Sequence, residues 1–288
     1  MRFQTCSDVV LAWAVGGVAY NLPEHVGFEF GSPGNPMYLR LEIHYNNPTL
    51  LSNIVDSSGI RMILTSQLRQ HDAGFLTTGV RTANMYFIPP YQKAFLSTGY
   101  CSSKCTELGI PRTGIKIFGL LQHAHLLGAG IKTRHIRNGT ELPPIAEDDH
   151  YDFDYQDIRA LKEEREVQAG DNIVVECTYD SSKRNKPTFF GLSTHEEMCS
   201  SFLFYYPKIP MSVCLSIPQI SSDSQEAIQQ FSGLNWKDLN VQRMFQELVN
   251  NSTHSAICNG SGPYTTNQFT SKVPVPTLPY RKPDQQCQ

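Results

Sequence analysis

The sequence has 288 residues, a net charge of −3, and 40% hydrophobic and 18% charged residues. These values are typical of a globular protein and exclude a disordered chain. No cluster of lysine and arginine marks a nucleic-acid surface, so nucleic acid is not an expected partner. No run reaches the ~18 consecutive apolar residues of a membrane-spanning helix.

Residues 9–19 (VVLAWAVGGVA) have the length of the apolar part of a signal peptide. Asp8 borders this run, and Trp13 and two glycines interrupt it, so we interpret it as a buried strand. The chain then carries no signal peptide, although its cysteines indicate export. We therefore expect an amino-terminally truncated chain.

Residues 38–45 (YLRLEIHY) alternate between apolar and polar side chains, which predicts a β-strand. His44 lies on the polar face of this strand, next to a turn at residues 46–48. A single histidine in such a place is usually only solvated.

From residue 79 to residue 206, short β-like runs alternate with turns roughly every 8–12 residues. This rhythm predicts an all-β fold with an antiparallel, jelly-roll-like β-sandwich. Apolar residues at helical spacing predict a short helix over 236–250, and a Pro-rich, irregular tail follows. We expect three units: part of a first β-sandwich (1–70), a second β-sandwich (71–216) and a tail with a short helix (217–288).

Eight cysteines and four Asn-x-Ser/Thr sequons indicate an oxidising compartment. The cysteines are scattered and form no Cys-x-x-Cys zinc pair. We therefore expect a location in the secretory pathway, namely the endoplasmic reticulum, a vesicle lumen or the cell exterior. The candidate glycosylation sites are Asn138, Asn250, Asn251 and Asn259.

His123 and His125 lie two residues apart on an apolar, strand-like run (117–127). Residues two apart on a strand share one face, so both rings could bind one metal ion. The motif alone is weak, and two histidines on a half-buried strand remain the simpler interpretation. The His195-Glu196 pair lacks the second histidine of a zincin. A thioether from Met198 would suit Cu(I), although on the sequence alone a core methionine is the far simpler interpretation of Met198.

Eight segments together carry a family resemblance, and they run in order along the chain. They are LRLEIHYNNP (39–48), DSSGIRM (56–62), GYCSSKC (99–105), GIKIFGLLQHAHLLG (114–128), DDHYDFDYQDIRALKEE (148–164), CTYDSSKR (177–184), GLSTHEEMC (191–199) and FLFYYP (202–207). With these segments the chain resembles the copper type II, ascorbate-dependent monooxygenases, which include dopamine β-hydroxylase and the peptidylglycine α-hydroxylating monooxygenase. The resemblance is greatest to the dopamine β-hydroxylase-like subgroup.

The resemblance implies two β-sandwiches, each with one copper, and ascorbate as the reductant that drives C–H hydroxylation by molecular oxygen. The oxygen-binding copper would be held by His123, His125 and Met198. The electron-transfer copper would need three histidines, of which only His44 has a counterpart here. The complete enzyme would bind two coppers, and this chain one.

The resemblance also implies disulfides and a substrate class. The implied disulfides are Cys101–Cys214, Cys105–Cys258 and Cys177–Cys199, with Cys6 and Cys287 left without partners.

Leu121, Ser200 and Phe202 replace the Arg, Asn and Tyr that bind peptides in the amidating enzyme. A small molecule, such as an aromatic amine, is therefore favoured over a peptide. The alternative is a catalytically inactive, secreted β-sandwich that binds copper or a partner, and the sequence also allows an oligomer.

Overall fold

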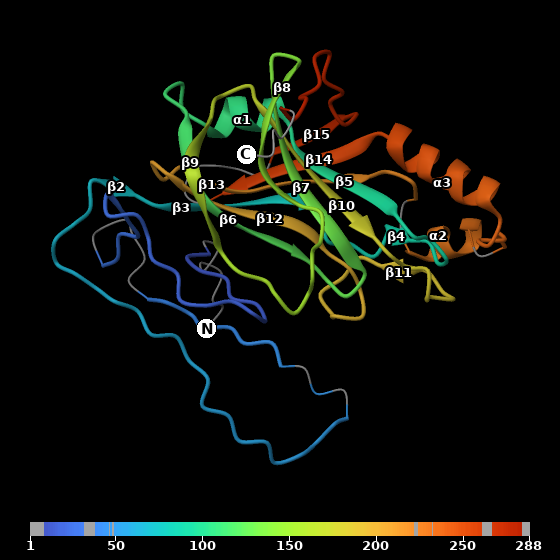
Figure 1. The fold of residues 1–288 in the computed structure, drawn as a ribbon, viewed down its shortest axis with the longest axis horizontal. Coiled ribbons are helices and arrows are strands. Elements are labelled where there is room, and N and C mark those ends of the chain that lie inside the picture. Colours follow the sequence, from blue (N-terminus) through green and yellow to red (C-terminus); the bar gives the residue numbers. More distant parts are fainter. Residues whose placement is uncertain are drawn as a thin grey trace.

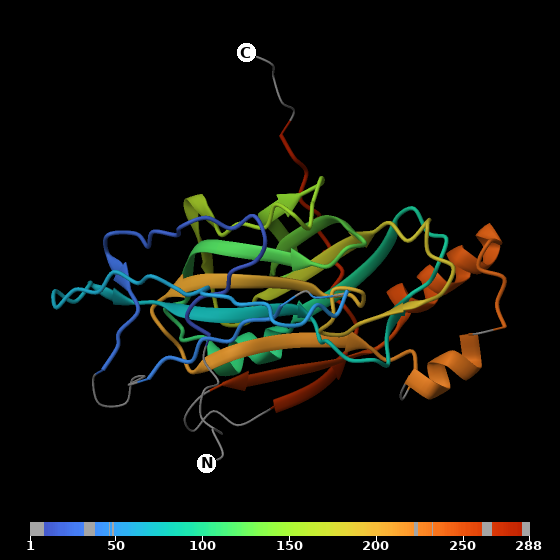
Figure 2. The ribbon, with the colours of Figure 1, turned by 90° about the horizontal axis from the view of Figure 1, so that it is seen from below.

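The fold of the chain is known from a computed structural model, which describes residues 9–31, 38–45, 47, 49–221, 224–231, 233–260 and 267–283. Two large sheets pack face to face (Figure 1; Figure 2). Within these two sheets, neighbouring strands are antiparallel except for one parallel pair in the larger sheet, β3 (Gly74–Val80) with β13 (Met211–Pro218). The predicted all-β sandwich is therefore confirmed.

The larger sheet contains, in spatial order, β15 (Asn267–Ser271), β14 (His254–Gly260), β13 (Met211–Pro218), β3 (Gly74–Val80), β12 (Cys199–Tyr206), β6 (Ile115–Ala124) and β9 (Arg159–Val167). The smaller sheet contains β5 (Phe95–Cys101), β10 (Asn172–Tyr179), β7 (Gly128–Arg137) and β8 (Thr140–Asp148). Two short pairs are β1 (Val26–Gly27) with β2 (His71–Asp72), and β4 (Phe87–Ile88) with β11 (Thr188–Phe189). The helices are α1 (Ser103–Gly109), α2 (Ser224–Phe231) and α3 (Leu239–Asn251).

Strand β12 shows why the larger sheet is buried on both faces. Leu203 and Tyr205 point toward the smaller sheet and join a core cluster that includes Ile173 of β10. Phe202 and Phe204 point the other way because alternate residues of a strand face opposite sides. An outer layer of the chain therefore has to cover that second face.

The amino-terminal segment provides this cover. Tyr20 and Phe28 pack against the outer-face cluster that contains Phe75 and Phe204. The strand predicted over 9–19 is wrong, because these residues form no strand in the structure. Of this run only Ala12 packs against the outer-face cluster, and the larger apolar side chains Leu11 and Trp13 stay 41% and 66% exposed, so no covered apolar face holds residues 9–19 as a strand.

The strand predicted over 38–45 is also wrong. These residues, together with 49–68, form a long irregular arm beside the sandwich (Figure 1). Alternation produces a strand only when a neighbouring strand supplies hydrogen bonds and another layer covers the apolar face. Leu39 and Ile43 remain 41% and 37% exposed, so the described residues supply no such layer.

The carboxyl-terminal region is more ordered than a tail with one helix. Helix α3 agrees with the helix predicted over 236–250, and α2 precedes it. Strand β13 runs through residue 216, and β14 and β15 extend the larger sheet beyond it. The end of β13 and the strands β14 and β15 are thus an integral part of the sandwich.

Three disulfides connect the elements of the sandwich. The pairs Cys101–Cys214, Cys105–Cys258 and Cys177–Cys199 are those that the family resemblance implies. The last pair joins β10 of the smaller sheet to β12 of the larger one. Cys6 and Cys287 lie outside the described residues.

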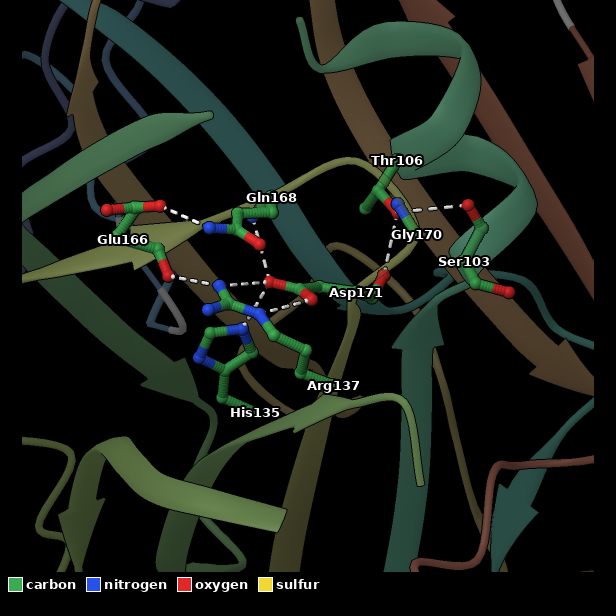
Figure 3. Close-up of polar contacts among 8 residues, drawn as sticks. All are labelled: Ser103, Thr106, His135, Arg137, Glu166, Gln168, Gly170 and Asp171. Atoms are coloured by element: carbon green, nitrogen blue, oxygen red, sulfur yellow. Dashed lines mark hydrogen bonds and ion pairs between the residues drawn. The ribbon is translucent and has the colours of Figure 1, made fainter. Parts of the chain in front are cut away.

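Asp171 organises a buried polar cluster where the chain crosses from β9 to β10 (Figure 3). Its carboxylate accepts hydrogen bonds from His135 Nε2 at 2.7 Å and from Arg137 Nε and Nη2 at 2.9 and 2.8 Å. Its carbonyl accepts one from Thr106 Oγ1 of α1 at 2.7 Å. Burial alone would raise the pKa of Asp171, but the hydrogen bonds from His135 and Arg137 outweigh it and hold the pKa at about 2.

We expect Asp171→Asn to lower the free energy of unfolding by about 3 kcal/mol, because Arg137 and His135 lose a buried ionic partner. The pKa of Asp171 is depressed from 3.8 to about 2. The difference in the free energy of unfolding between the variant and wild type should therefore be largest above about pH 4 and shrink as the pH falls toward 2. Urea unfolding at several pH values measures it. Glu163→Gln, at an exposed ion pair with Arg165, is the control and should change stability by less than about 0.5 kcal/mol.

Candidate metal centre

His123 and His125 face the outer side of the larger sheet, at the end of β6. The neighbouring Gln122 points inward, where its Nε2 donates to the Ile131 carbonyl at 3.0 Å. His123 therefore points to the opposite face. The centroids of the His123 and His125 rings are 5.1 Å apart, with an interplanar angle of 80°. The two imidazoles are neighbours, as their spacing predicts.

Gln156 determines which nitrogen of His123 carries the proton. Its Nε2 donates to the Phe153 carbonyl at 2.8 Å, which turns its Oε1 toward His123. His123 Nδ1 lies 2.5 Å from that oxygen. Because an amide oxygen can only accept, His123 Nδ1 must be the donor, and the lone pair of Nε2 remains available.

The amino-terminal segment in turn holds Gln156. The Gln156 backbone N–H donates to the Val15 carbonyl at 2.9 Å. Gly16 has a φ of +88°, and a Cβ at this position would lie 2.5 Å from the Asp154 carbonyl oxygen. Only glycine therefore allows this close approach.

His125 has the same tautomer for the same reason. Its Nδ1 lies 3.0 Å from the Glu196 backbone carbonyl, which can only accept. Imidazoles that bind metals commonly donate one ring N–H to an oxygen acceptor and bind with the other nitrogen. His123 and His125 both have this arrangement.

Burial keeps both rings neutral. It lowers the pKa of His123 from 6.5 to about 4 and also lowers the pKa of His125. A metal ion binds the neutral imidazole, so little proton competition is expected at neutral pH.

The pairing of β6 with β12 brings the backbone of Met198 near that of His125, and the N–H groups of both donate to the same oxygen of Glu197. Cys199 pairs with Ala124, and Ser200 pairs with His123. The ladder ends at that first pair, and the same register continued by one residue would put Met198 opposite His125. The Tyr179 hydroxyl donates to the Met198 carbonyl at 2.6 Å, and the next residue, Cys199, is in a disulfide. Two neutral imidazoles and a thioether form a donor set that fits Cu(I).

Glu197 is a fully buried carboxylate between the two segments that carry these side chains. It accepts backbone hydrogen bonds from His125, Leu127 and Met198. Burial raises its pKa to about 7. The sequence prediction missed Glu197 and Gln156. The only signal was their place inside two of the family-like segments, since neither residue type marks a metal site by itself.

His44 lies apart from any such cluster. Its side chain is 69% exposed, and its Nε2 lies 3.0 Å from Glu42 Oε1. In the part of the chain that the structure describes, no three His, Cys, Asp or Glu side chains form a group that could hold a metal. A role for His44 in an electron-transfer site thus stays a prediction.

We expect the metal-free protein to carry the proton of both His123 and His125 on Nδ1. Two-bond ¹H–¹⁵N NMR correlations distinguish the two ring nitrogens and measure this directly. In Gln156→Leu the His123 Nδ1–H loses its acceptor, so His123 should show mixed tautomers while His125 stays unchanged as an internal control. A wild-type His123 with its proton on Nε2 would contradict the geometry described above.

Comparison with known families identifies a copper-dependent family. Residues 71–227 match the family model for the C-terminal domain of the copper type II ascorbate-dependent monooxygenases. Residues 1–52 match the model for the N-terminal domain of the same family.

Three curated relatives support membership of the same family. Human DBH-like monooxygenase protein 1 is 42% identical over 226 residues, covering 77% of this chain and 37% of the relative. Mouse DBH-like monooxygenase protein 2 is 39% identical, covering 84% and 41%. Bovine dopamine β-hydroxylase is 34% identical, covering 96% and 48%. The chain thus spans less than half the length of each of these three relatives. The chain belongs to the copper type II ascorbate-dependent monooxygenase family.

Proposed function

We propose that His123, His125 and Met198 bind copper as the oxygen-reactive centre of a monooxygenase that hydroxylates a C–H bond of a small molecule. The observation that carries this proposal is the pair of neutral imidazoles, His125 buried and His123 half-buried, whose Nδ1–H groups are engaged beside the backbone of Met198. Copper bound there would supply one-electron chemistry with molecular oxygen, with ascorbate as the reductant.

The residues around the ligands have separate roles. Gln156 and the Glu196 carbonyl keep the proton on Nδ1 of His123 and His125, which directs each Nε2 toward the metal. Phe202 lies 6.1 Å from His123, and Phe153 lies 6.2 Å from His125, measured between ring centroids. These apolar flanks support a small aromatic substrate, such as an aromatic amine.

Peptide binding has less support. The amidating enzyme of this family binds the peptide through Arg, Asn and Tyr, and this chain has Leu121, Ser200 and Phe202 at those positions. None of these three side chains carries a positive charge that could bind a peptide carboxylate.

The alternative function is a secreted copper-binding protein without turnover. Two observations favour it for this chain: His44 is exposed in an arm without a sheet, and of the three histidines that the resemblance implies for the electron-transfer copper only His44 has a counterpart in the sequence. Under either function we expect about one copper per chain, at His123, His125 and Met198.

We also propose the secretory pathway as the location. Three disulfides and four exposed sequon asparagines (Asn138, Asn250, Asn251 and Asn259) support an oxidising, glycosylating compartment. Among the described residues, no helix has the length and apolar character needed to cross a membrane.

We expect the purified chain to bind about one Cu(I), and His123→Ala to lose this binding, because a single imidazole and a thioether hold copper too weakly. Anaerobic titration against a chromophoric Cu(I) chelator measures the stoichiometry. His195→Ala, which removes an exposed histidine outside the site, is the matched control and should bind like wild type. Unchanged stoichiometry in His123→Ala would reject the ligand assignment.

Oxygen uptake separates the two functions. We expect little ascorbate-driven oxygen consumption by this chain, since His44 alone cannot form the three-histidine site that the resemblance implies. Hydroxylation of an aromatic amine, coupled to oxygen uptake and lost in His123→Ala, would instead select the monooxygenase for the chain by itself.

A further inference from the structure

The two segments that carry the proposed copper ligands stop pairing as strands just before they reach His125 and Met198. The ladder between β6 and β12 ends at the Ala124–Cys199 pair. His125 and Leu127 are nevertheless buried, with 4% and 7% of their surface exposed. Buried backbone N–H groups need acceptors, so something other than the sheet has to bind them.

The side chain of Glu197 provides those acceptors. Its Oε2 accepts from the backbone N–H of His125 at 2.9 Å and of Met198 at 3.3 Å. Its Oε1 accepts from the backbone N–H of Leu127 at 2.7 Å. One carboxylate therefore bonds to the main chains of two proposed ligands that are distant in sequence.

Glu197 is itself held from the opposite side. Its backbone N–H donates to the Phe189 carbonyl at 2.9 Å, and its carbonyl accepts from the Gly191 N–H at 3.1 Å. The side chain is fully buried, and both of its oxygens are used by backbone donors. It is thus a fixed bridge between segments and has no oxygen left over to serve as a further metal ligand.

The neighbouring glutamate does not share this task. The carboxylate of Glu196 accepts from the Ser193 backbone N–H at 3.0 Å, within the preceding turn. Only the backbone carbonyl of Glu196 reaches His125. The bridging role belongs to the side chain of Glu197 alone.

We propose that Glu197 is a positioning residue of the copper site, holding His125 and Met198 at one fixed separation. This inference rests on the proposed function, because it concerns the same ligands. The positioning role requires that both side-chain oxygens of Glu197 accept hydrogen bonds. Glutamine would replace one acceptor with an NH₂ group that faces a backbone N–H, and aspartate would be too short by one methylene to reach both segments.

The test compares Glu197→Gln with wild type in three measurements. The Kd for Cu(I) should rise roughly 10-fold to 100-fold, the usual effect of losing an outer-shell partner of a metal ligand. The copper–sulfur contribution in X-ray absorption should weaken, because Met198 is no longer held opposite His125. In the metal-free protein, the amides of His125, Leu127 and Met198 should exchange with solvent roughly 10-fold faster.

Asp171→Asn is the matched control. It also removes a buried carboxylate that accepts a backbone hydrogen bond, from Gln168 at 2.8 Å, and it also lowers stability. It should leave the Kd for Cu(I) and the copper–sulfur signal within about twofold of wild type. A role of Glu197 in general stability alone would instead make the two variants behave alike.

Two outcomes distinguish a failure of the positioning role from a failure of the proposed function on which it rests. If wild type and His123→Ala differ in copper binding but Glu197→Gln matches wild type, the positioning role is wrong and the copper site stands. If wild type binds no Cu(I), or His123→Ala binds normally, the proposed function itself fails. Should Glu197→Gln not fold, Glu197→Asp keeps the charge and is read in the same way, with wild-type affinity again refuting the inference.

Discussion

The antiparallel pairing of β6 with β12 is the constraint on which the candidate centre depends. It joins the strand of His123 to the strand that follows Met198, and the Ala124–Cys199 pair determines which residues face one another. A shift of one residue would turn His123 into the core and Gln122 outward, because neighbouring side chains on a strand face opposite sides. The disulfide between Cys177 and Cys199 anchors the same pair to the smaller sheet.

Burial shifts the pKa values of the two kinds of ionisable group at this centre in opposite directions. It keeps His123 and His125 neutral, which leaves their nitrogens free to bind a metal. It also raises the pKa of Glu197, and three backbone N–H groups oppose that effect by stabilising the carboxylate. The centre therefore combines soft, neutral donors with an outer carboxylate that holds the backbone.

The outer face of the larger sheet connects this centre to the amino-terminal segment. Tyr20 covers the sheet near Phe204, and a few residues earlier the Val15 carbonyl binds the backbone of Gln156. Gln156 in turn accepts the Nδ1–H of His123. Residues that match the N-terminal family model thus support a histidine that matches the C-terminal one. The two parts of the chain are coupled through this glutamine.

The sequence by itself determined the β-sandwich, the shared face of His123 and His125, and the family. Each depends on order along the chain, either on the two-residue period of a strand or on motifs in a fixed succession. Only the tertiary structure decided that Gln156 contacts His123 and that the Glu197 carboxylate accepts hydrogen bonds from the backbones of His125 and Met198. These are contacts between distant segments, and they follow from strand register and burial. The same reason explains why the strand predicted at 38–45 is wrong. Alternation shows that a segment could form a strand, but whether a neighbouring strand pairs with it depends on the tertiary fold.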